Sequence, residues 1–122
     1  MSYLLSPVIY LESKDFTPSG NLKHFKDKTC VIMVQSNNCG HCTTAKPHFQ
    51  KFANKFTNKN KSVVCLTIEN DDSEDGKKLL DTVVKIKPSF EGFPDYLLYR
   101  KGKFVNKEIN GRTEASLEEY IR

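Results

Sequence analysis

The sequence has few cysteines, no long hydrophobic run and little net charge. Four cysteines in 122 residues are too few for a disulfide-stapled scaffold, and a chain of this length can bury a core without one. No hydrophobic run is long enough to span a membrane. A formal net charge of +4 without a recognition motif does not indicate nucleic-acid binding. We find no repeat or linker, and therefore expect a single domain over residues 1–122 that binds neither nucleic acid nor membrane.

The only C-x-x-C motif of the sequence spans residues 39–42. Two thiols at this spacing form either a redox dithiol or half of a tetrahedral zinc site, which needs a second pair of ligands. Cys30 and Cys65 each stand alone in apolar runs, and His48 would supply at best a third ligand. We therefore favour a redox pair over a zinc site, and we expect no bound metal and no organic cofactor.

The residues around this motif predict a strand, a short turn and a helix. Residues 30–34 are rich in β-branched side chains, residues 36–38 are polar and can cap a helix, and Phe49, Phe52 and Phe56 recur at helical spacing. Cys39 then lies at the helix N-terminus, where free N–H groups and the helix dipole favour a thiolate and lower its pKa.

With these features the chain resembles proteins of the thioredoxin fold. The tetrapeptide Cys39-Gly40-His41-Cys42 is similar to the active site of protein disulfide isomerase domains. Pro47, the segment Gly92-Phe93-Pro94 and the pair Gly111-Arg112 are further similarities. The resemblance implies an α/β protein with the thioredoxin fold, in which a central mixed β-sheet is flanked by helices on both faces.

The two cysteines have different expected roles. We predict that Cys39 attacks a substrate disulfide, because only a thiolate is nucleophilic and Cys39 lies at the positive helix end. Cys42 would then resolve the mixed disulfide. His41 can add positive charge beside the thiols, although it could also be an ordinary exposed turn residue.

Four further residues owe their expected roles to the resemblance or to their size. The resemblance implies a cis peptide bond between Phe93 and Pro94, which would face the cysteines and bind a substrate peptide. Gly40 has no side chain and would leave room for that peptide. Arg112 corresponds to an arginine that approaches the second cysteine in isomerase-like proteins, and it could equally be a capping or surface residue.

Two positions depart from the family pattern. Asn38 stands where the family usually places an aromatic residue, directly before the first cysteine. Met33 stands six positions before Cys39, where the family usually buries an acid, and no lysine between Val63 and Ile68 could pair with such an acid. We therefore predict slow resolution of mixed disulfides by Cys42.

The remaining elements follow from hydrophobic periodicity and turn residues. In the first half of the chain they predict a strand at 8–11, one or two helical turns at 21–26 that carry a surface His24, and a strand at 63–68. A helix follows the acidic run 71–76, and its predicted buried residues are Leu79, Leu80, Val83 and Val84. A hairpin around Lys101-Gly102 and a last helix capped by Thr113 complete the chain. We interpret Cys30 and Cys65 as small buried hydrophobic residues, which could form a disulfide only if their strands are neighbours.

These observations predict a thiol–disulfide oxidoreductase that exchanges disulfides with protein substrates through Cys39 and Cys42 and is recharged by an unidentified redox partner. A redox-idle adaptor module and a zinc-holding domain are the alternatives. We expect a monomer. The first residues, 1–7, lack a secretory signal and the last residues lack a retention signal. We therefore expect a cytoplasmic or other intracellular location, and a viral protein would fit this expectation. The glycosylation sequon at 60–62 would then stay unmodified.

Overall fold

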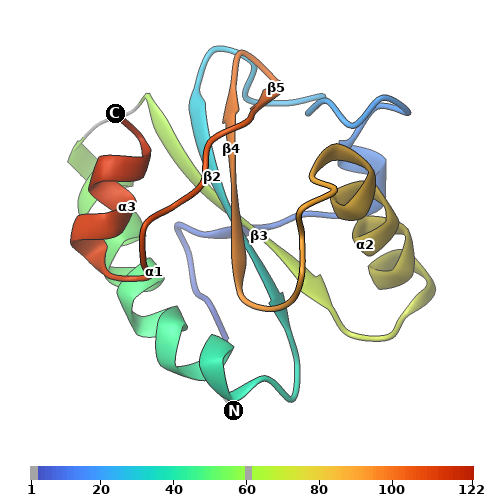
Figure 1. Cartoon of the computed structure of the whole chain (residues 1–122). Helices are drawn as coiled ribbons and strands as arrows, with labels where there is room; N and C mark the ends of the chain where they lie inside the picture. The colour runs from blue at the N-terminus through green and yellow to red at the C-terminus, as the bar shows by residue number, and fades with distance from the viewer. Residues whose placement is uncertain (1–2, 60–61) are drawn as a thin grey trace.

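The computed structural model describes residues 3–59 and 62–122, so Asn60 and Lys61 of the sequon lie outside the described residues. Outside residues 13–26, the strands and helices follow one another in the predicted order (Figure 1). The elements are β1 Ile9–Tyr10, the 3-10 helix η1 Ser13–Asp15, β2 Thr29–Ser36, α1 Gly40–Lys59, β3 Val63–Asn70, α2 Glu74–Ile86, β4 Asp95–Arg100, β5 Lys103–Val105 and α3 Glu114–Tyr120.

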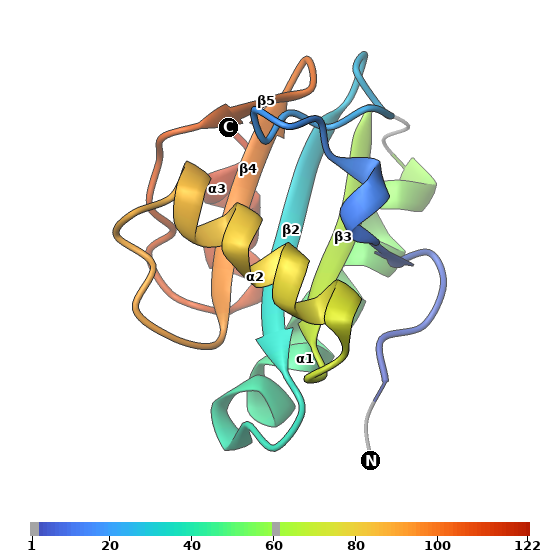
Figure 2. The same cartoon turned by 90° about the vertical axis from the view of Figure 1, so that its right-hand side faces the viewer.

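The strands form one mixed five-stranded sheet in the order β1-β3-β2-β4-β5. β1, β3 and β2 are parallel, whereas β4 is antiparallel to β2 and β5 is antiparallel to β4. α1 and α3 lie on one side of the sheet and α2 lies on the other, as both views show (Figures 1 and 2). This arrangement confirms the predicted thioredoxin fold.

Alternation along β2 builds a separate hydrophobic core on each face of the sheet. Val31 and Met33 belong to the core with Phe49, Phe52 and Leu117, which come from α1 and α3. The other face of β2 supplies Cys30, Ile32 and Val34 to the second core, together with side chains from α2, β3, β4 and the segments on either side of η1. Because β2 is covered on both faces, its continuous apolar sequence is explained.

Cys30 and Cys65 are buried free thiols on opposite faces of the sheet. β2 and β3 are indeed neighbours, but Cys30 lies opposite Val64 and Cys65 lies opposite Val31. A shift of one residue in the register reverses the face, so these cysteines do not form a disulfide. Their interpretation as small buried hydrophobic residues fits both observations.

The helix predicted for residues 21–26 is wrong, because this segment is an irregular connection. Leu22 donates its N–H to the carbonyl of Gly102 at 2.8 Å, and Lys23 donates to the carbonyl of Asp15 at 2.9 Å. These distant partners replace the local hydrogen bonds of a helix. His24 lies 3.6 Å from a carboxylate oxygen of Asp15, so it has a partner that the sequence did not suggest.

The acidic run starts α2, as predicted. Ser73 caps the helix by accepting the N–H of Gly76 at 2.9 Å. Leu79 and Val83 are buried, but Val84 is 50% exposed, so its predicted burial is wrong. A single sheet face covers only a narrow stripe of a helix, and the adjacent Val84 falls outside it.

Candidate active site

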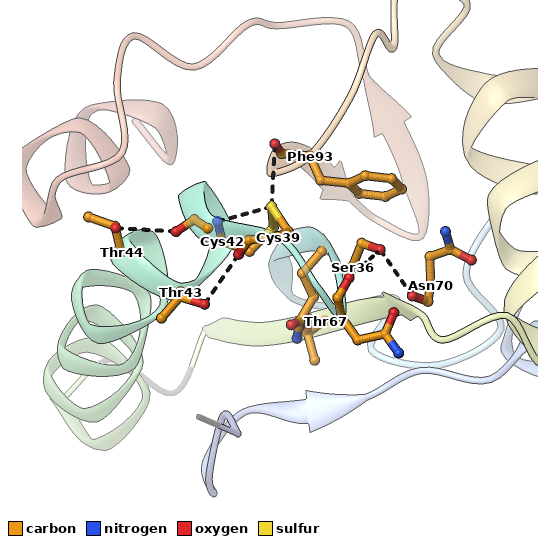
Figure 3. Close-up of a disulfide and its surroundings, with 11 residues drawn as sticks. Ser36, Cys39, Cys42, Thr43, Thr44, Thr67, Asn70 and Phe93 are labelled. Atoms are coloured by element: carbon orange, nitrogen blue, oxygen red, sulfur yellow. Dashed lines mark hydrogen bonds between the residues drawn. A yellow bond between two sulfur atoms is a disulfide. The ribbon is translucent and has the colours of Figure 1, made fainter. Parts of the chain in front are cut away.

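Cys39 and Cys42 are joined in a disulfide at the N-terminal end of α1, with their Cα atoms 5.2 Å apart (Figure 3). β2 ends at Ser36, three residues before Cys39, and α1 begins at Gly40. Asn38 completes the turn in a left-handed conformation with φ of 61°, which asparagine tolerates better than most residues. β2, the most buried strand of the sheet, therefore fixes the position of the cysteine pair.

The two sulfur atoms differ in exposure and in hydrogen bonding. Cys39 is half-buried, whereas Cys42 is 0% exposed. The backbone N–H of Cys42 donates to Cys39 Sγ at 3.1 Å. An N–H at a helix N-terminus that points to sulfur stabilises negative charge there. The geometry therefore favours a thiolate on Cys39 once the disulfide is reduced.

The segment before β4 faces the disulfide from another side. Cys39 Sγ lies 3.7 Å from the carbonyl oxygen of Phe93, and the Phe93–Pro94 peptide bond is cis. Figure 3 draws this carbonyl above the Cys39 sulfur. Pro94 is buried and Phe93 is half-buried against Phe90, with ring centroids 5.3 Å apart. The structure thus brings together Cys39, Cys42, Phe93 and Pro94 from two distant parts of the chain.

An ion pair joins the two ends of the loop that carries Phe93. Lys87, the C-cap residue of α2, is nearly buried, and its Nζ lies 2.9 Å from Asp95 and 3.0 Å from Glu108. Lys87 and Asp95 flank the loop 88–94, so their pairing fixes its two ends. Sequence reasoning missed Lys87, and only its position directly before Pro88 could have marked it as the end of a helix.

Three of the predicted site residues are exposed. Gly40 and His41 occupy the first turn of α1 and point to solvent, and a Cβ at Gly40 would meet nothing within 4 Å. Arg112 lies in the loop before α3. Burial raises the pKa of Tyr96 to about 12, and the positive charge of Arg112 acts against this rise.

A neutral polar pair lies in the core where the family's buried acid is missing. Met33 is fully buried and pairs in register with Thr67 of β3. The Thr67 hydroxyl donates to the Met33 carbonyl at 2.8 Å and accepts from the Gln35 side-chain amide at 2.9 Å. Sequence reasoning missed Gln35, although it is the polar residue that directly follows the apolar run 30–34. Met33 and its partner Thr67 are both uncharged.

A cavity of about 590 Å³ opens beside Cys39. Its wall is formed by the turn between β2 and α1, by one side of α1, by the end of β3 and by Tyr3 near the N-terminus. Lys46 and Glu69 are its charged residues. Lys46 is 8% exposed, which is unusual for a lysine. The sequence contains no signal for this cavity, because its walls come from separate elements.

Across residues 3–59 and 62–122, no three His, Cys, Asp or Glu side chains are grouped so that they could hold a metal ion. His48 therefore does not join Cys39 and Cys42 in a site with three ligands. Nor does any described helix combine the length and apolar character needed to cross a bilayer.

Comparison with known proteins agrees with this geometry. The thioredoxin family model matches residues 8–122. A thioredoxin-like protein of Invertebrate iridescent virus 6 is 42% identical over 131 aligned positions, which cover 98% of this chain and 95% of that protein. Mouse thioredoxin is 34% identical, with 77% of this chain and 81% of that protein covered. The chain belongs to the thioredoxin family.

More distant relatives extend the similarity. The protein disulfide-isomerase of Ricinus communis is 30% identical over 96% of this chain, which corresponds to 22% of that protein. Among solved structures, thioredoxin f from spinach chloroplasts has a TM-score of 0.66 with 21% identity, and 99% of this chain and 96% of that chain are covered. This structural likeness supports the fold. Together with the bonded C-x-x-C pair, the family indicates thiol–disulfide oxidoreductase chemistry in general.

Proposed function

We propose that the protein exchanges disulfides with protein substrates, with Cys39 as the attacking thiol and Cys42 as the resolving thiol. The observation that carries this proposal is the difference between the sulfur atoms: Cys39 is partly exposed and accepts the Cys42 N–H at 3.1 Å, whereas Cys42 is fully buried. A substrate can reach only the first, and the helix N-terminus stabilises its thiolate.

The exchange takes two steps. The Cys39 thiolate attacks one sulfur of a substrate disulfide, forms a mixed disulfide and releases the other substrate sulfur as a thiolate. Cys42 then loses its proton and attacks Cys39 Sγ, which forms the Cys39–Cys42 disulfide and releases the second substrate thiolate. The Phe93 carbonyl, 3.7 Å from Cys39 Sγ, is placed to accept a hydrogen bond from a substrate backbone N–H. An external thiol donor or acceptor must restore the pair.

Reduction of insulin by dithiothreitol tests the proposal. The wild-type protein should accelerate the reduction, Cys39→Ser should abolish the acceleration, and Cys42→Ser should accumulate a mixed disulfide with Cys39 that mass spectrometry detects. Cys30→Ala is the matched control, because Cys30 is a buried free thiol on the opposite sheet face. An active Cys39→Ser variant would contradict the assignment, and an inactive wild-type protein would favour the adaptor alternative.

The reduction potential then decides the direction of electron flow. A value near about −270 mV is typical of thioredoxins and indicates a reductase. A value near about −180 mV is typical of protein disulfide isomerase and indicates an oxidant or isomerase. Equilibration of the Cys39–Cys42 pair with glutathione buffers of defined ratio measures it.

A further inference from the structure

Gln35 carries a buried hydrogen-bond acceptor that lacks a donor. Its side chain is 0% exposed, and its Oε1 accepts no hydrogen bond from any residue in the described ranges 3–59 and 62–122. A buried acceptor without a donor bears the full penalty of leaving water, and most buried polar groups in native proteins have a partner. The donor can come from another state of the protein, and the Cys39–Cys42 pair has such a state.

The hydrogen bonds of Thr67 fix the orientation of the Gln35 amide. The Thr67 hydroxyl donates its single proton to the Met33 carbonyl at 2.8 Å. It can therefore only accept at its contact with Gln35, which is 2.9 Å long, so the amide nitrogen must face Thr67. The oxygen Oε1 is then the free atom of the amide, because the opposite orientation would bring two acceptors together.

Gln35 and Cys42 face the same layer of the molecule, between the sheet and α1. Gln35 lies two residues after Met33 on β2, so both side chains point to one face of the sheet, and Met33 belongs to the core that α1 covers. Cys42 precedes Phe49 of the same core by about two turns of α1 and is 0% exposed. The two side chains therefore point towards each other's element.

The end of β2 and the start of α1 lie together. Gln35 is the last residue but one of β2, and Cys42 is in the first turn of α1. Both overall views draw these two ends side by side (Figures 1 and 2). Figure 3 includes Thr67, which accepts the Gln35 amide N–H, among the surroundings of the disulfide. These observations place the free acceptor in the layer beneath Cys42.

We propose that Gln35 Oε1 accepts a hydrogen bond from the Cys42 thiol in the reduced protein, so that Gln35 is a positioning residue that favours reduction of the pair. The inference rests on the proposed redox exchange by Cys39 and Cys42. In the disulfide, Cys42 Sγ has no hydrogen and leaves Oε1 unsatisfied, whereas in the dithiol it can donate one. Gln35 therefore stabilises the reduced protein relative to the oxidised protein and makes the disulfide a stronger oxidant.

The reduction balances with two external thiols RSH. The first, as RS⁻, attacks Cys39 Sγ and breaks the Cys39–Cys42 bond, and the Cys42 thiolate takes up a proton and donates a hydrogen bond to Gln35. The second RS⁻ attacks the RS sulfur of the mixed disulfide, which forms RSSR and releases Cys39 as a thiolate. Two electrons pass to the pair; one of the two thiol protons stays on Cys42 and the other goes to solvent.

The redox equilibrium of the wild-type protein and of Gln35→Met tests the inference. Methionine has a similar size and lacks the amide oxygen. Each protein is equilibrated with glutathione buffers of defined ratio, alkylated and analysed by mass spectrometry. The oxidation constant of Gln35→Met should be about fivefold higher, which corresponds to about 20 mV in the reducing direction. Tyr96→Phe is the matched control, because Tyr96 carries another buried hydroxyl on this sheet face without a partner among the described residues; it should leave the constant unchanged.

Urea unfolding separates this contact from a general loss of packing. A change in packing alone alters the free energy of unfolding equally in the oxidised and reduced proteins. Loss of the thiol contact affects the reduced protein only, so Gln35→Met should raise its unfolding constant about fivefold relative to that of the oxidised protein. In a Cys42→Ala background, which has no thiol at this position, Gln35→Met should have the same effect as in the oxidised protein.

Infrared spectroscopy of the reduced protein needs no change at Gln35. The S–H stretching band of Cys42 is the difference between the spectra of Cys39→Ser and of the double variant Cys39→Ser, Cys42→Ser. A hydrogen bond to a carbonyl oxygen weakens the S–H bond, so the band should lie below that of a thiol in an apolar solvent. A band at the apolar-solvent frequency would overturn the inference, even if Gln35→Met fails to fold.

The remaining outcomes also decide. An oxidation constant of Gln35→Met within about twofold of the wild-type value would overturn the inference, as would a shift that appears in Tyr96→Phe instead. The equilibrium is measured without a protein substrate. A wild-type pair that shows the Gln35 effect but fails to reduce insulin therefore removes the proposed function and leaves this inference standing. Insulin reduction with an unshifted Gln35→Met constant removes only this inference, and a pair that does not equilibrate with glutathione removes both.

Discussion

Replacing Lys87 by methionine should destabilise the protein and loosen the loop that faces the disulfide. The ammonium group of Lys87 contacts the Asp95 carboxylate at 2.9 Å, the Glu108 carboxylate at 3.0 Å and the Tyr96 carbonyl at 3.4 Å. Methionine has a similar length, so the substitution removes the charge and the hydrogen bonds without leaving a large cavity.

The expected magnitude follows from the exposure of the three charged side chains. The Lys87 and Asp95 side chains are 4% and 18% exposed, whereas that of Glu108 is 64% exposed. Breaking a fully buried pair costs about 3–5 kcal/mol. Glu108 regains solvent at little cost, and Asp95 keeps the Tyr96 N–H at 2.8 Å. We therefore expect Lys87→Met to lower the free energy of unfolding by about 2–3 kcal/mol.

Urea unfolding at neutral pH, followed by far-ultraviolet circular dichroism, measures this loss. Lys78→Met on the exposed face of α2 is the control and should cost less than about 0.5 kcal/mol. Asp95→Asn in the Lys87→Met background removes the unpaired carboxylate and should restore part of the stability. The reasoning is refuted if Lys87→Met costs no more than the control, or if the double variant is less stable than Lys87→Met alone.

Four other predictions concern the cysteines and their surroundings. In the reduced native protein at pH 8, a thiol reagent should modify Cys39 fast and leave Cys30 and Cys65 unmodified, because burial raises the pKa of Cys30 and of Cys65 to about 12; fast modification of Cys30 or Cys65 before denaturant is added would contradict this. The folded state keeps these protons longer than the unfolded state, so the free energy of unfolding should fall as pH rises from about 9 towards 12, and a flat profile in urea titrations would show that the thiols are not desolvated. His41→Pro removes a group beside the thiolate and should make the pair more reducing by roughly 30 mV or more, which glutathione equilibration would detect; an unchanged potential would exclude His41. Met33→Glu should shorten the lifetime of mixed disulfides in quenched-flow trapping while it destabilises the fold, and an unchanged lifetime in a folded variant would show that another base serves Cys42.

Much of the fold was predictable because its signals are local. The apolar run after Cys30 predicts β2, the recurrence of phenylalanine predicts α1, and Thr113 caps α3 by accepting the N–H of Ser116 at 3.2 Å. The position of Cys39 at a helix start follows from the same residues. Each of these features depends on neighbours within a few positions of the chain.

The features that were missed depend on contacts between distant residues. Leu22 and Lys23 satisfy their N–H groups on Gly102 and Asp15, which no local pattern shows. The burial of Lys87 depends on Asp95 and Glu108 converging on it. The faces of Cys30 and Cys65 depend on a register that a one-residue slip would reverse. Sequence reasoning and the resemblance anticipate the cysteine pair and the Phe93–Pro94 segment that faces it, but not the Lys87 ion pairs or the cavity.

The two edges of the sheet limit how a client can be held. β1 has two residues and β5 has three, and these are the outermost strands. An extended peptide can add to a sheet only along a sufficiently long row of free backbone groups, and neither edge provides one. Under the proposed function, an unfolded protein substrate is therefore not expected to bind by adding a strand at either edge. Under the proposed function, such a client would be held at the mixed disulfide with Cys39 and at the Phe93 carbonyl beside it, away from both edges of the sheet.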